Sequence, residues 1–294
     1  MVAGSTDTGF AGGVAARLDA GTDTDYGPLA GGHFRVLTWN LWWRFGAWEE
    51  RLAAIVEAVR RLDPDIACLQ EVWIDDGAED SSARRVAEAL GAEHRGGHRL
   101  DVDGIGFGNA VVSRWPISGS EVLPLPAPDG ADELRVCVRV DVDSPHGPLQ
   151  VFSTHLNWRF DQSHVRQEQV RAICEFIAAA PTRTFPPILC GDMNSTPDSD
   201  EIRMLTGKTA VPVPKLVFHD AWEAAGDGPG LTWSNDNPHA RRGLEPDRRI
   251  DYVLVGWPKA GGRGQVIDVE VVGTEPIEGV VPSDHYGVMA TLRA

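Results

Sequence analysis

The chain has 294 residues, 42% of them hydrophobic, which is enough for one large domain or two small ones. Its 27 basic and 43 acidic residues give a net charge of −16 with histidine neutral. This balance argues against an extended nucleic-acid surface, because binding along a phosphate backbone relies on clustered Lys and Arg. It leaves room for a local basic pocket.

Residues 1–32 are rich in Gly, Ala, Asp and Thr, and they lack both the basic start and the apolar core of a signal peptide. We expect this stretch to be a disordered or loosely attached extension. Nowhere in the chain does an apolar run approach the ~18 residues that a transmembrane helix needs.

Apolar residues at helical spacing predict three helices in the remainder of the chain. The first begins near Trp48 and is stopped by Pro64. The second starts at about Ser82 and ends before Gly91, and the third covers roughly residues 162–179.

Shorter apolar runs between these helices predict strands. In residues 134–142 apolar positions alternate with Arg, Cys and Asp, which predicts a half-buried strand. Residues 109–113 and 265–272 show a similar pattern. Strands interspersed with helices indicate an α/β fold in which two packed sheets are covered outside by helices. We expect one domain over residues 33–294.

The cysteines lie in apolar or amphipathic runs without CxxC spacing, at Cys68, Cys137, Cys174 and Cys190. We expect small buried hydrophobic side chains rather than a disulfide framework or a zinc site, with two buried bridges as the alternative. This usage favours a cytoplasmic protein, which we expect to be a monomer.

Six apolar runs carry a polar side chain suited to chemistry at one end. The clearest is the run that ends in residues 191–194, Gly-Asp-Met-Asn. The polar residues are Asn40, Glu71, His155 with Asn157, Asp192 with Asn194, Asp251, and Asp284 with His285. Each alone is also ordinary turn or strand-end chemistry. Together, strand ends can converge on one rim of a sheet protein, where sites are usually built.

The carboxylate and amide members of this set are hard oxygen ligands without an accompanying thiolate, which suits Mg²⁺ or Mn²⁺. The two histidines, His155 and His285, can donate to a phosphoryl oxygen or move a proton. A metal, carboxylates and two histidines are the equipment for in-line attack of water on phosphorus.

The order of these motifs resembles the endonuclease/exonuclease/phosphatase superfamily, with its DNase I-like nucleases and phosphatases, from about residue 33 to the C-terminus. Seven short motifs carry the resemblance: Trp39-Asn40, Leu69-Gln70-Glu71-Val72, residues 108–114, Thr154-His155-Leu156, residues 191–194, residues 249–252 and Ser283-Asp284-His285. The resemblance implies a four-layered α/β/β/α sandwich, with two mixed sheets flanked by helices and a divalent metal at one rim.

The resemblance also implies roles for individual residues. Glu71 is expected to be the principal metal ligand, while Asn40 helps to hold the metal or phosphate and Asp284 completes the metal environment. The expected cofactor is Mg²⁺ or Mn²⁺.

For the reaction itself, the resemblance assigns the attacking water to Asp192, which orients or deprotonates it, and to Asn194, which fixes it and a phosphate oxygen. Asp251 is expected to hydrogen-bond His285 and keep that ring charged or correctly oriented. His155 is expected to contact the phosphoryl group.

Four further residues are predicted to contact substrate: Asn109, Asn157, Arg159 and Arg166. The arginines suit bidentate contact with a second phosphate. A cluster of aromatic residues, Trp42, Trp43, Phe45, Trp48 and Trp73, either stacks on substrate or fills loop and core packing.

These features predict a metal-dependent phosphoesterase that acts on a phosphate ester, with a phosphodiester of a small or lipid-derived substrate favoured. A Mg²⁺-dependent nuclease of the same fold is the alternative, and it needs local arginine contacts to offset the acidic charge. A catalytically inactive module that binds phosphate esters is the third.

Overall fold

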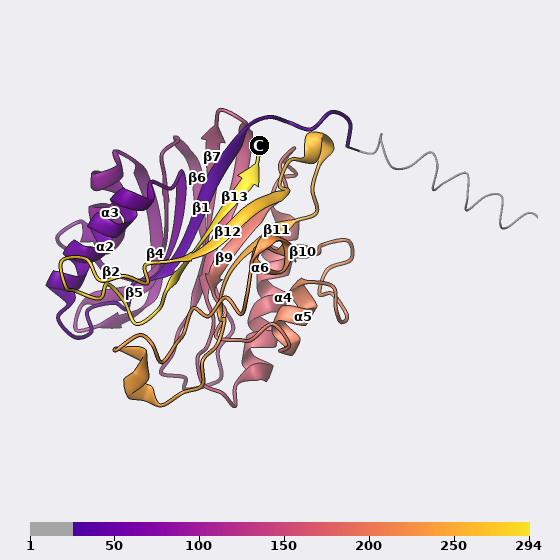
Figure 1. Ribbon diagram of the computed structural model, residues 1–294. Coiled ribbons are helices and arrows are strands. Elements are labelled where there is room, and N and C mark those ends of the chain that lie inside the picture. Colours follow the sequence, from indigo (N-terminus) through magenta and orange to yellow (C-terminus); the bar gives the residue numbers. More distant parts are fainter. Residues whose placement is uncertain (1–25) are drawn as a thin grey trace, which may run out of the picture.

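The computed structural model describes residues 26–294 and shows two β-sheets packed face to face with helices on both outer sides (Figure 1). The first sheet has seven strands in the order β12-β13-β1-β2-β5-β4, with β3 paired to β2. Its strands are β1 (His33–Asn40), β2 (Ile66–Asp75), β3 (Asp80–Ser81), β4 (Glu93–Val102), β5 (Ile105–Ser113), β12 (Val266–Val272) and β13 (Gly287–Arg293).

The second sheet has six strands in the order β10-β11-β9-β8-β7-β6. Its strands are β6 (Ile117–Pro124), β7 (Val136–Ser144), β8 (Gly147–His155), β9 (Ile188–Asp192), β10 (Phe218–Asp220) and β11 (Asp251–Gly256). Both sheets are mixed, because β1 runs parallel to β2 and β8 runs parallel to β9 while their other neighbours are antiparallel. The predicted sandwich of two mixed sheets flanked by helices is confirmed.

Three apolar clusters hold the layers together. One lies between the sheets and contains Val36 and Val138. A second lies under α2 and α3, around Trp39, and the third lies under α4 and α5, around Phe152. The helices are α2 (Trp48–Leu62), α3 (Ser82–Leu90), α4 (Ser163–Ala179), α5 (Asp200–Leu205) and α6 (Ala221–Ala225), with short 3₁₀ turns at Ala240–Gly243 and Ala260–Gly262.

The three predicted helices are confirmed as α2, α3 and α4 to within a residue or two of their expected ends. The start of α3 is capped by Ser81, whose hydroxyl accepts from the Arg84 N–H, and Gly91 ends it in the left-handed region at φ 62°.

The strand predicted over residues 134–142 is confirmed as β7, which begins two residues later, but the prediction that it is half-buried is wrong. The strand, β7, has both faces buried over most of its length. Val138 faces the other sheet, while Cys137 faces outward into the cluster under α4. Alternation with polar residues predicted a solvent face, but the helix layer covers that face instead.

Three further predictions concern the N-terminal residues, the cysteines and membrane-spanning helices. The prediction for residues 1–32 falls mainly outside the described residues, although Ala30 donates a backbone hydrogen bond to Gly261 at 2.8 Å. All four cysteines are buried and unpaired. Within residues 26–294 none of the helices is both long and apolar enough to span a bilayer.

Strand pairing brings the polar strand ends to one edge of the sandwich. Asn40 ends β1 opposite Gln70, beside the irregularity in the parallel neighbour β2. His155 ends β8 directly opposite Asp192, which ends the parallel strand β9. Asp251 opens the antiparallel strand β11 on the other side of Asp192. Residues as far apart in the chain as Asn40 and Asp251, which are 211 positions apart, therefore meet without any long loop having to reach them.

Candidate active site

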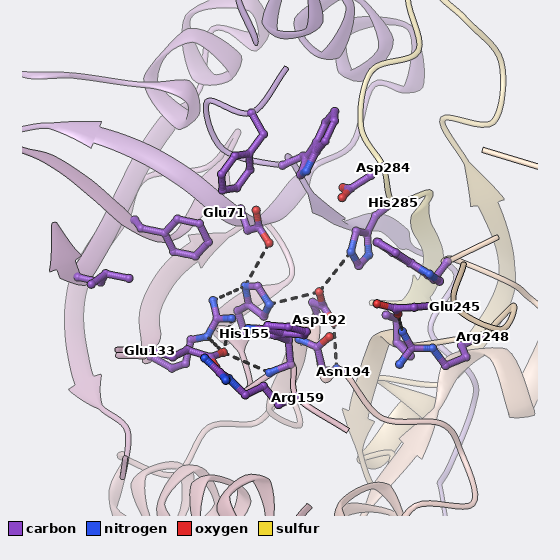
Figure 2. Close-up of a pocket in the computed structure, with 18 of the residues that line it drawn as sticks. Glu71, Glu133, His155, Arg159, Asp192, Asn194, Glu245, Arg248, Asp284 and His285 are labelled. Atoms are coloured by element: carbon purple, nitrogen blue, oxygen red, sulfur yellow. Dashed lines mark hydrogen bonds and ion pairs between the residues drawn. The ribbon is translucent and has the colours of Figure 1, made fainter. Parts of the chain in front are cut away.

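A pocket of about 440 Å³ opens at this edge (Figure 2). Its floor is formed by Glu71, His155, Asp192, Asp284 and His285. Its inner walls are formed by Glu133, Arg135, Asn194 and Ile250, and its mouth is formed by Trp42, Phe45, Leu100, Phe107, Asp132, Trp158, Arg159, Trp233, Glu245 and Arg248. We call these three groups the floor, the walls and the mouth.

Glu71 reaches the floor because β2 bulges at that point. Gln70 and Glu71 together stand opposite the single residue Asn109 of β5, and Glu71 adopts φ 50°. Such a bulge turns a side chain away from the regular alternation of the strand. The Glu71 Oε1 atom accepts from the Asn40 amide at 3.1 Å, whereas Oε2 is buried without a hydrogen-bond partner.

Asp192 is the most heavily surrounded group of the floor. Its Oδ1 accepts from the backbone N–H of Asn194 at 2.9 Å, and Asn194 itself is left-handed at φ 49°. Three donors converge on Oδ2: the Asn40 amide at 3.0 Å, His155 Nε2 at 3.4 Å and His285 Nε2 at 3.6 Å. The two histidine contacts are longer than a good hydrogen bond, so both rings can turn to another acceptor in the pocket.

The strand that delivers Asp192 is packed closely against β8. A Cβ atom on the preceding residue, Gly191, would lie 2.1 Å from the Thr154 carbonyl oxygen. Only glycine allows β8 and β9 to approach this closely, and their approach sets the contact between His155 and Asp192.

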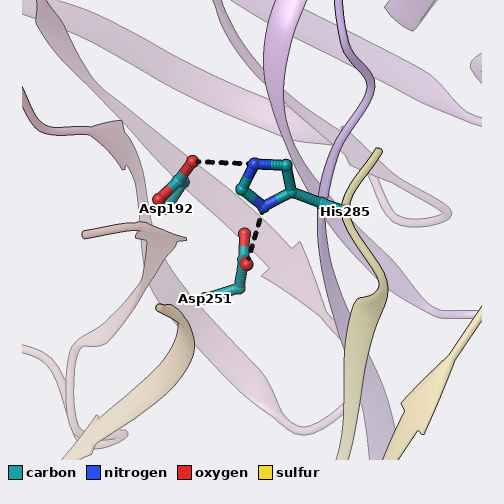
Figure 3. A group of neighbouring side chains, drawn as sticks. All are labelled: Asp192, Asp251 and His285. Carbon is teal, nitrogen blue, oxygen red and sulfur yellow. Dashed lines mark hydrogen bonds and ion pairs between the residues drawn. The ribbon is translucent and has the colours of Figure 1, made fainter. Parts of the chain in front are cut away.

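His285 is held from behind by Asp251 (Figure 3), whose Oδ2 lies 2.9 Å from Nδ1. Burial opposes the charge on this ring, but Asp251 and Asp192 outweigh it and raise the pKa of His285 well above its usual value. The ring is therefore a cation that donates from both nitrogens. Asp192, Asp251 and His285 have the composition of a metal-binding group, but here the imidazolium supplies the positive charge between the two carboxylates.

His155 has a positively charged neighbour where His285 has a negatively charged one. An arginine, Arg135, lies 2.9 Å from its Nδ1. Burial, followed by repulsion from Arg135 and His285, lowers the pKa of His155 well below its usual value. Arg135 and its partner Glu133 were not among the predicted site residues, although two opposite charges directly before a buried strand were a signal that the pair is buried too.

Two carboxylates of the floor fit a divalent cation. Burial raises the pKa of Glu71, although Arg135 and Asn40 oppose the shift. Burial also raises the pKa of Asp284 to about 7, with repulsion from Glu71 adding to the effect and His285 opposing it. A shared cation would relieve both groups, and the unpartnered Oε2 of Glu71 is available to it. Asn40 instead turns its amide nitrogen to Glu71 and Asp192, while its oxygen accepts from the Trp42 N–H at 2.9 Å.

Of the four residues expected to contact substrate, the structure places only Arg159 in the pocket, where it pairs with Asp132 at 3.0 Å. Asn109 and Asn157 are buried, and they donate to the Val136 carbonyl and the Gln162 side chain. These two predictions are corrected, because both amides are used inside the protein.

Arg166 is also corrected from a substrate contact to a scaffold residue. Its guanidinium is buried on α4, donating to Glu201 at 2.6 Å and to the backbone carbonyls of Asn157 and Arg159. It thereby ties the loop that follows β8 to the body of the domain, and it does not line the pocket.

Some residues of the predicted aromatic cluster line the pocket, where they can stack on substrate, and others pack elsewhere. Trp42 and Phe45 line the mouth. Trp48 and Trp73 instead flank the Arg44 guanidinium, with ring centres 4.8 and 4.5 Å away, outside this pocket. The mouth also contains Phe107, Trp158 and Trp233, which lie outside the predicted aromatic cluster.

Comparison with known proteins gives the same family as the sequence motifs. Residues 37–285 match the Endonuclease/Exonuclease/phosphatase family. The chain belongs to this family. Members of the endonuclease/exonuclease/phosphatase family are metal-dependent phosphoesterases and nucleases.

Two curated relatives in the endonuclease/exonuclease/phosphatase family share 29% identity with the chain. Protein angel of Drosophila melanogaster aligns over 216 residues, which is 65% of this chain and 57% of angel. Uncharacterized protein YbhP of Escherichia coli K12 aligns over 173 residues, 55% of this chain and 66% of YbhP. The chain thus spans less than two thirds of the length of either relative.

Solved structures in the endonuclease/exonuclease/phosphatase family share the fold. The family protein of Beutenbergia cavernae has 25% identity and a TM-score of 0.65, with 89% of this chain and 71% of that chain covered. TDP2 of D. rerio, complexed with single strand DNA product, has 18% identity and a TM-score of 0.71. The alignment covers 90% of this chain and 100% of that chain.

Proposed function

We propose that this protein is a divalent-metal-dependent phosphodiesterase in which Asp192 directs a water molecule at phosphorus. The observation that supports this most strongly is the convergence of donors on Asp192 Oδ2, directly beside the cation-ready carboxylates Glu71 and Asp284. A phosphoryl group placed there would meet proton donors, a proton acceptor and carboxylates that hold a cation in one small space.

Each floor residue then has a defined task. Asp192 accepts the proton of the attacking water, and burial together with repulsion from Asp251 raises the pKa of this carboxyl to about 7, against the lowering effect of His285 and Asn40. A base with a pKa near ambient pH is well matched to this step. Asn194 fixes the Asp192 carboxylate through its backbone N–H.

The two histidines act on the phosphoryl oxygens and not on the attacking water. His285, a cation held by Asp251, and His155 each present Nε2 to the point where the phosphoryl oxygens would lie. Their donors stabilise the charge that builds up on those oxygens. When bound at Glu71 and Asp284, Mg²⁺ or Mn²⁺ would supply further charge neutralisation.

The charges of the pocket favour a substrate with a single phosphodiester and an apolar or aromatic substituent. Six carboxylates and three arginines line the pocket, and each arginine is paired to one of those carboxylates: Arg135 to Glu133, Arg159 to Asp132, and Arg248 to Glu245. No described arginine of this pocket is left over for a second phosphate. The aromatic side chains of the mouth offer stacking surfaces to the rest of a small or lipid-derived substrate.

A Mg²⁺-dependent nuclease is the second candidate, and the aromatic mouth is the observation that favours it, since bases stack on such side chains. The net charge of −16 and the paired arginines oppose it. A salt titration of oligonucleotide binding separates the two, because a track of phosphate contacts gives a steep fall in affinity with salt and a single contact does not.

We assign the catalytic domain to residues 33–294, and the buried, unpaired thiols support a cytoplasmic location. The test of the function is a screen with Mg²⁺ or Mn²⁺ across phosphate monoesters, diesters, nucleotides, oligonucleotides and phospholipids, with Asp192→Asn as the control. We expect diester hydrolysis that needs metal and is lost in the control. Binding without turnover in any class would favour an inactive module.

A further inference from the structure

The two histidines of the floor face the same oxygen of Asp192, but their second nitrogens have partners of opposite kind. Behind His285 stands Asp251, a carboxylate that only accepts when ionised. Behind His155 stands Arg135, a guanidinium that only donates. The partner of a ring's second nitrogen decides which nitrogen carries the proton.

Arg135 therefore determines the tautomer of His155. An arginine side chain has no acceptor and stays protonated, so Nδ1 at 2.9 Å must accept. The ring proton must then sit on Nε2, which faces Asp192 Oδ2 at 3.4 Å. Among residues 26–294, the acceptor that competes for Nδ1 is Glu71 Oε1, which would favour the other tautomer, but it lies at 4.0 Å.

Glu133 holds Arg135 in this position. Its Oε1 accepts from both Nε, at 2.8 Å, and Nη2 of the guanidinium. The same oxygen accepts from the Trp158 N–H at 3.1 Å, which connects the pair to the mouth of the pocket. Glu133 and Arg135 are both more than nine-tenths buried, so neither side chain has a solvent-exposed alternative position at low cost.

We propose that Glu133 and Arg135 are a positioning pair that locks His155 in its Nε2–H tautomer, so that it meets substrate as a neutral hydrogen-bond donor. His155 and His285 then divide the work: one neutral ring and one cationic ring offer Nε2–H to the same phosphoryl oxygens. The tautomer follows from the contacts alone, while its value to catalysis rests on the proposed function.

The tautomer is measurable without any substrate. We would label the full-length protein with ¹⁵N-histidine, assign His155 with the variant His155→Gln, and record two-bond ¹H–¹⁵N correlations at neutral pH without added metal. We expect a pyridine-type Nδ1 and a pyrrole-type Nε2 in the wild type. A protonated Nδ1 in the wild type, alone or together with Nε2, overturns the proposal.

Arg135→Met removes the donor at similar volume and should move the ring proton of His155 to Nδ1, where Glu71 Oε1 is then the nearest acceptor, whereas Arg135→Lys should retain the Nε2–H form. The matched control is Arg139→Met, because Arg139 lies on β7 and pairs with Glu121 and Asp141 without contacting His155. A wild-type spectrum for His155 in Arg135→Met would also overturn the proposal. If Arg135→Met does not fold, the wild-type spectrum and Arg135→Lys still decide.

A kinetic series with bis(4-nitrophenyl) phosphate and Mg²⁺ tests the catalytic value of the pair. We expect kcat to fall about 100-fold in Arg135→Met, as for loss of a transition-state donor, with KM changed far less. Glu133→Gln should lower kcat about 10-fold, as for an outer-shell partner, while the control Glu121→Gln keeps the wild-type value.

The two proposals fail in different ways. If the wild type hydrolyses no phosphate ester, the proposed function fails and the tautomer result stands by itself. If the wild type is active and Arg135→Met keeps its kcat, the positioning role fails and the proposed function stands.

Discussion

The floor and the mouth of the pocket are built in different ways. The floor residues lie at strand ends, at the bulge of β2 or in the segment before β13, and most of them are buried. They also hold one another, since Asp192 alone receives donors from Asn40 and Asn194 and contacts from both histidines. The mouth consists mostly of loop side chains such as Trp158, which is 49% exposed, and it includes arginines paired with their own carboxylates.

This difference assigns catalysis to the floor and substrate specificity to the mouth. A buried floor on paired strands keeps its geometry whatever enters the pocket, which preorganised catalysis requires. An exposed mouth on loops can change without disturbing the fold, and it contacts the parts of a substrate that do not react. We therefore expect floor variants to change kcat and mouth variants to change KM.

The largest effect is expected from Asp192→Asn. The carboxamide keeps the shape of the side chain but cannot accept the proton of water, so kcat should fall about 10³- to 10⁴-fold, comparable to losses at other catalytic carboxylates. Thermal unfolding of the variant confirms that it folds. A loss of less than tenfold in kcat would break the distinction between floor and mouth.

The second largest effect is expected at Arg166, which anchors the loop that carries Trp158 and Arg159. Arg166→Met leaves the fully buried Glu201 carboxylate without its partner, so the free energy of unfolding should fall by about 3–5 kcal/mol. Urea unfolding measures this loss. The double variant Arg166→Met with Glu201→Leu should recover most of it, since an apolar pair carries no unpaired charge. A double variant as unstable as the single one would contradict this account of the ion pair.

Metal binding should stabilise the floor. At a Mg²⁺ concentration of about 100 times Kd, the free energy of unfolding should rise by about 2.7 kcal/mol in the wild type. Glu71→Gln should lose this increase, while Glu79→Gln, at an exposed site on the loop after β2, should keep it. Thermal unfolding with and without Mg²⁺ measures both, and equal increases in the two variants would exclude Glu71 as a ligand.

The smallest effect is expected at the mouth. Trp158→Ala removes an exposed stacking surface, so KM should rise about threefold to tenfold with kcat unchanged, in keeping with about 1 kcal/mol for an aromatic contact. Trp257→Ala is the matched control, because Trp257 is 58% exposed and lies outside the pocket. A fall in kcat without a change in KM would show that the mouth takes part in chemistry.

The same contrast explains what the sequence could predict. Each floor residue ends or opens an apolar run, so a strand pattern locates it, and the order of the motifs is specific to a family. Parallel pairing of β1 with β2 and of β8 with β9 then brings those ends together. The covered outer face of β7 could not be foreseen, because Asp141 looks like a solvent-facing residue until its contacts with Gln150 and Arg183 are known.

The mouth was harder to predict for a physical reason. Whether a loop arginine meets substrate or a carboxylate depends on which loop packs beside it, and local spacing carries no such information. Arg159 and Arg166 are seven residues apart on one segment, yet one lines the pocket and the other is buried against Glu201. Trp233 reaches the mouth from a distant segment without any motif around it, and Phe107 directly precedes the motif of residues 108–114 without belonging to it.

The most direct test of water attack at phosphorus is hydrolysis of a phosphodiester in H₂¹⁸O with Mg²⁺, followed by mass spectrometry of both products. The account predicts one ¹⁸O atom in the phosphate-containing product of the wild type and no labelled product above background with Asp192→Asn. Label in the alcohol product, or equal labelling by the variant, would contradict it.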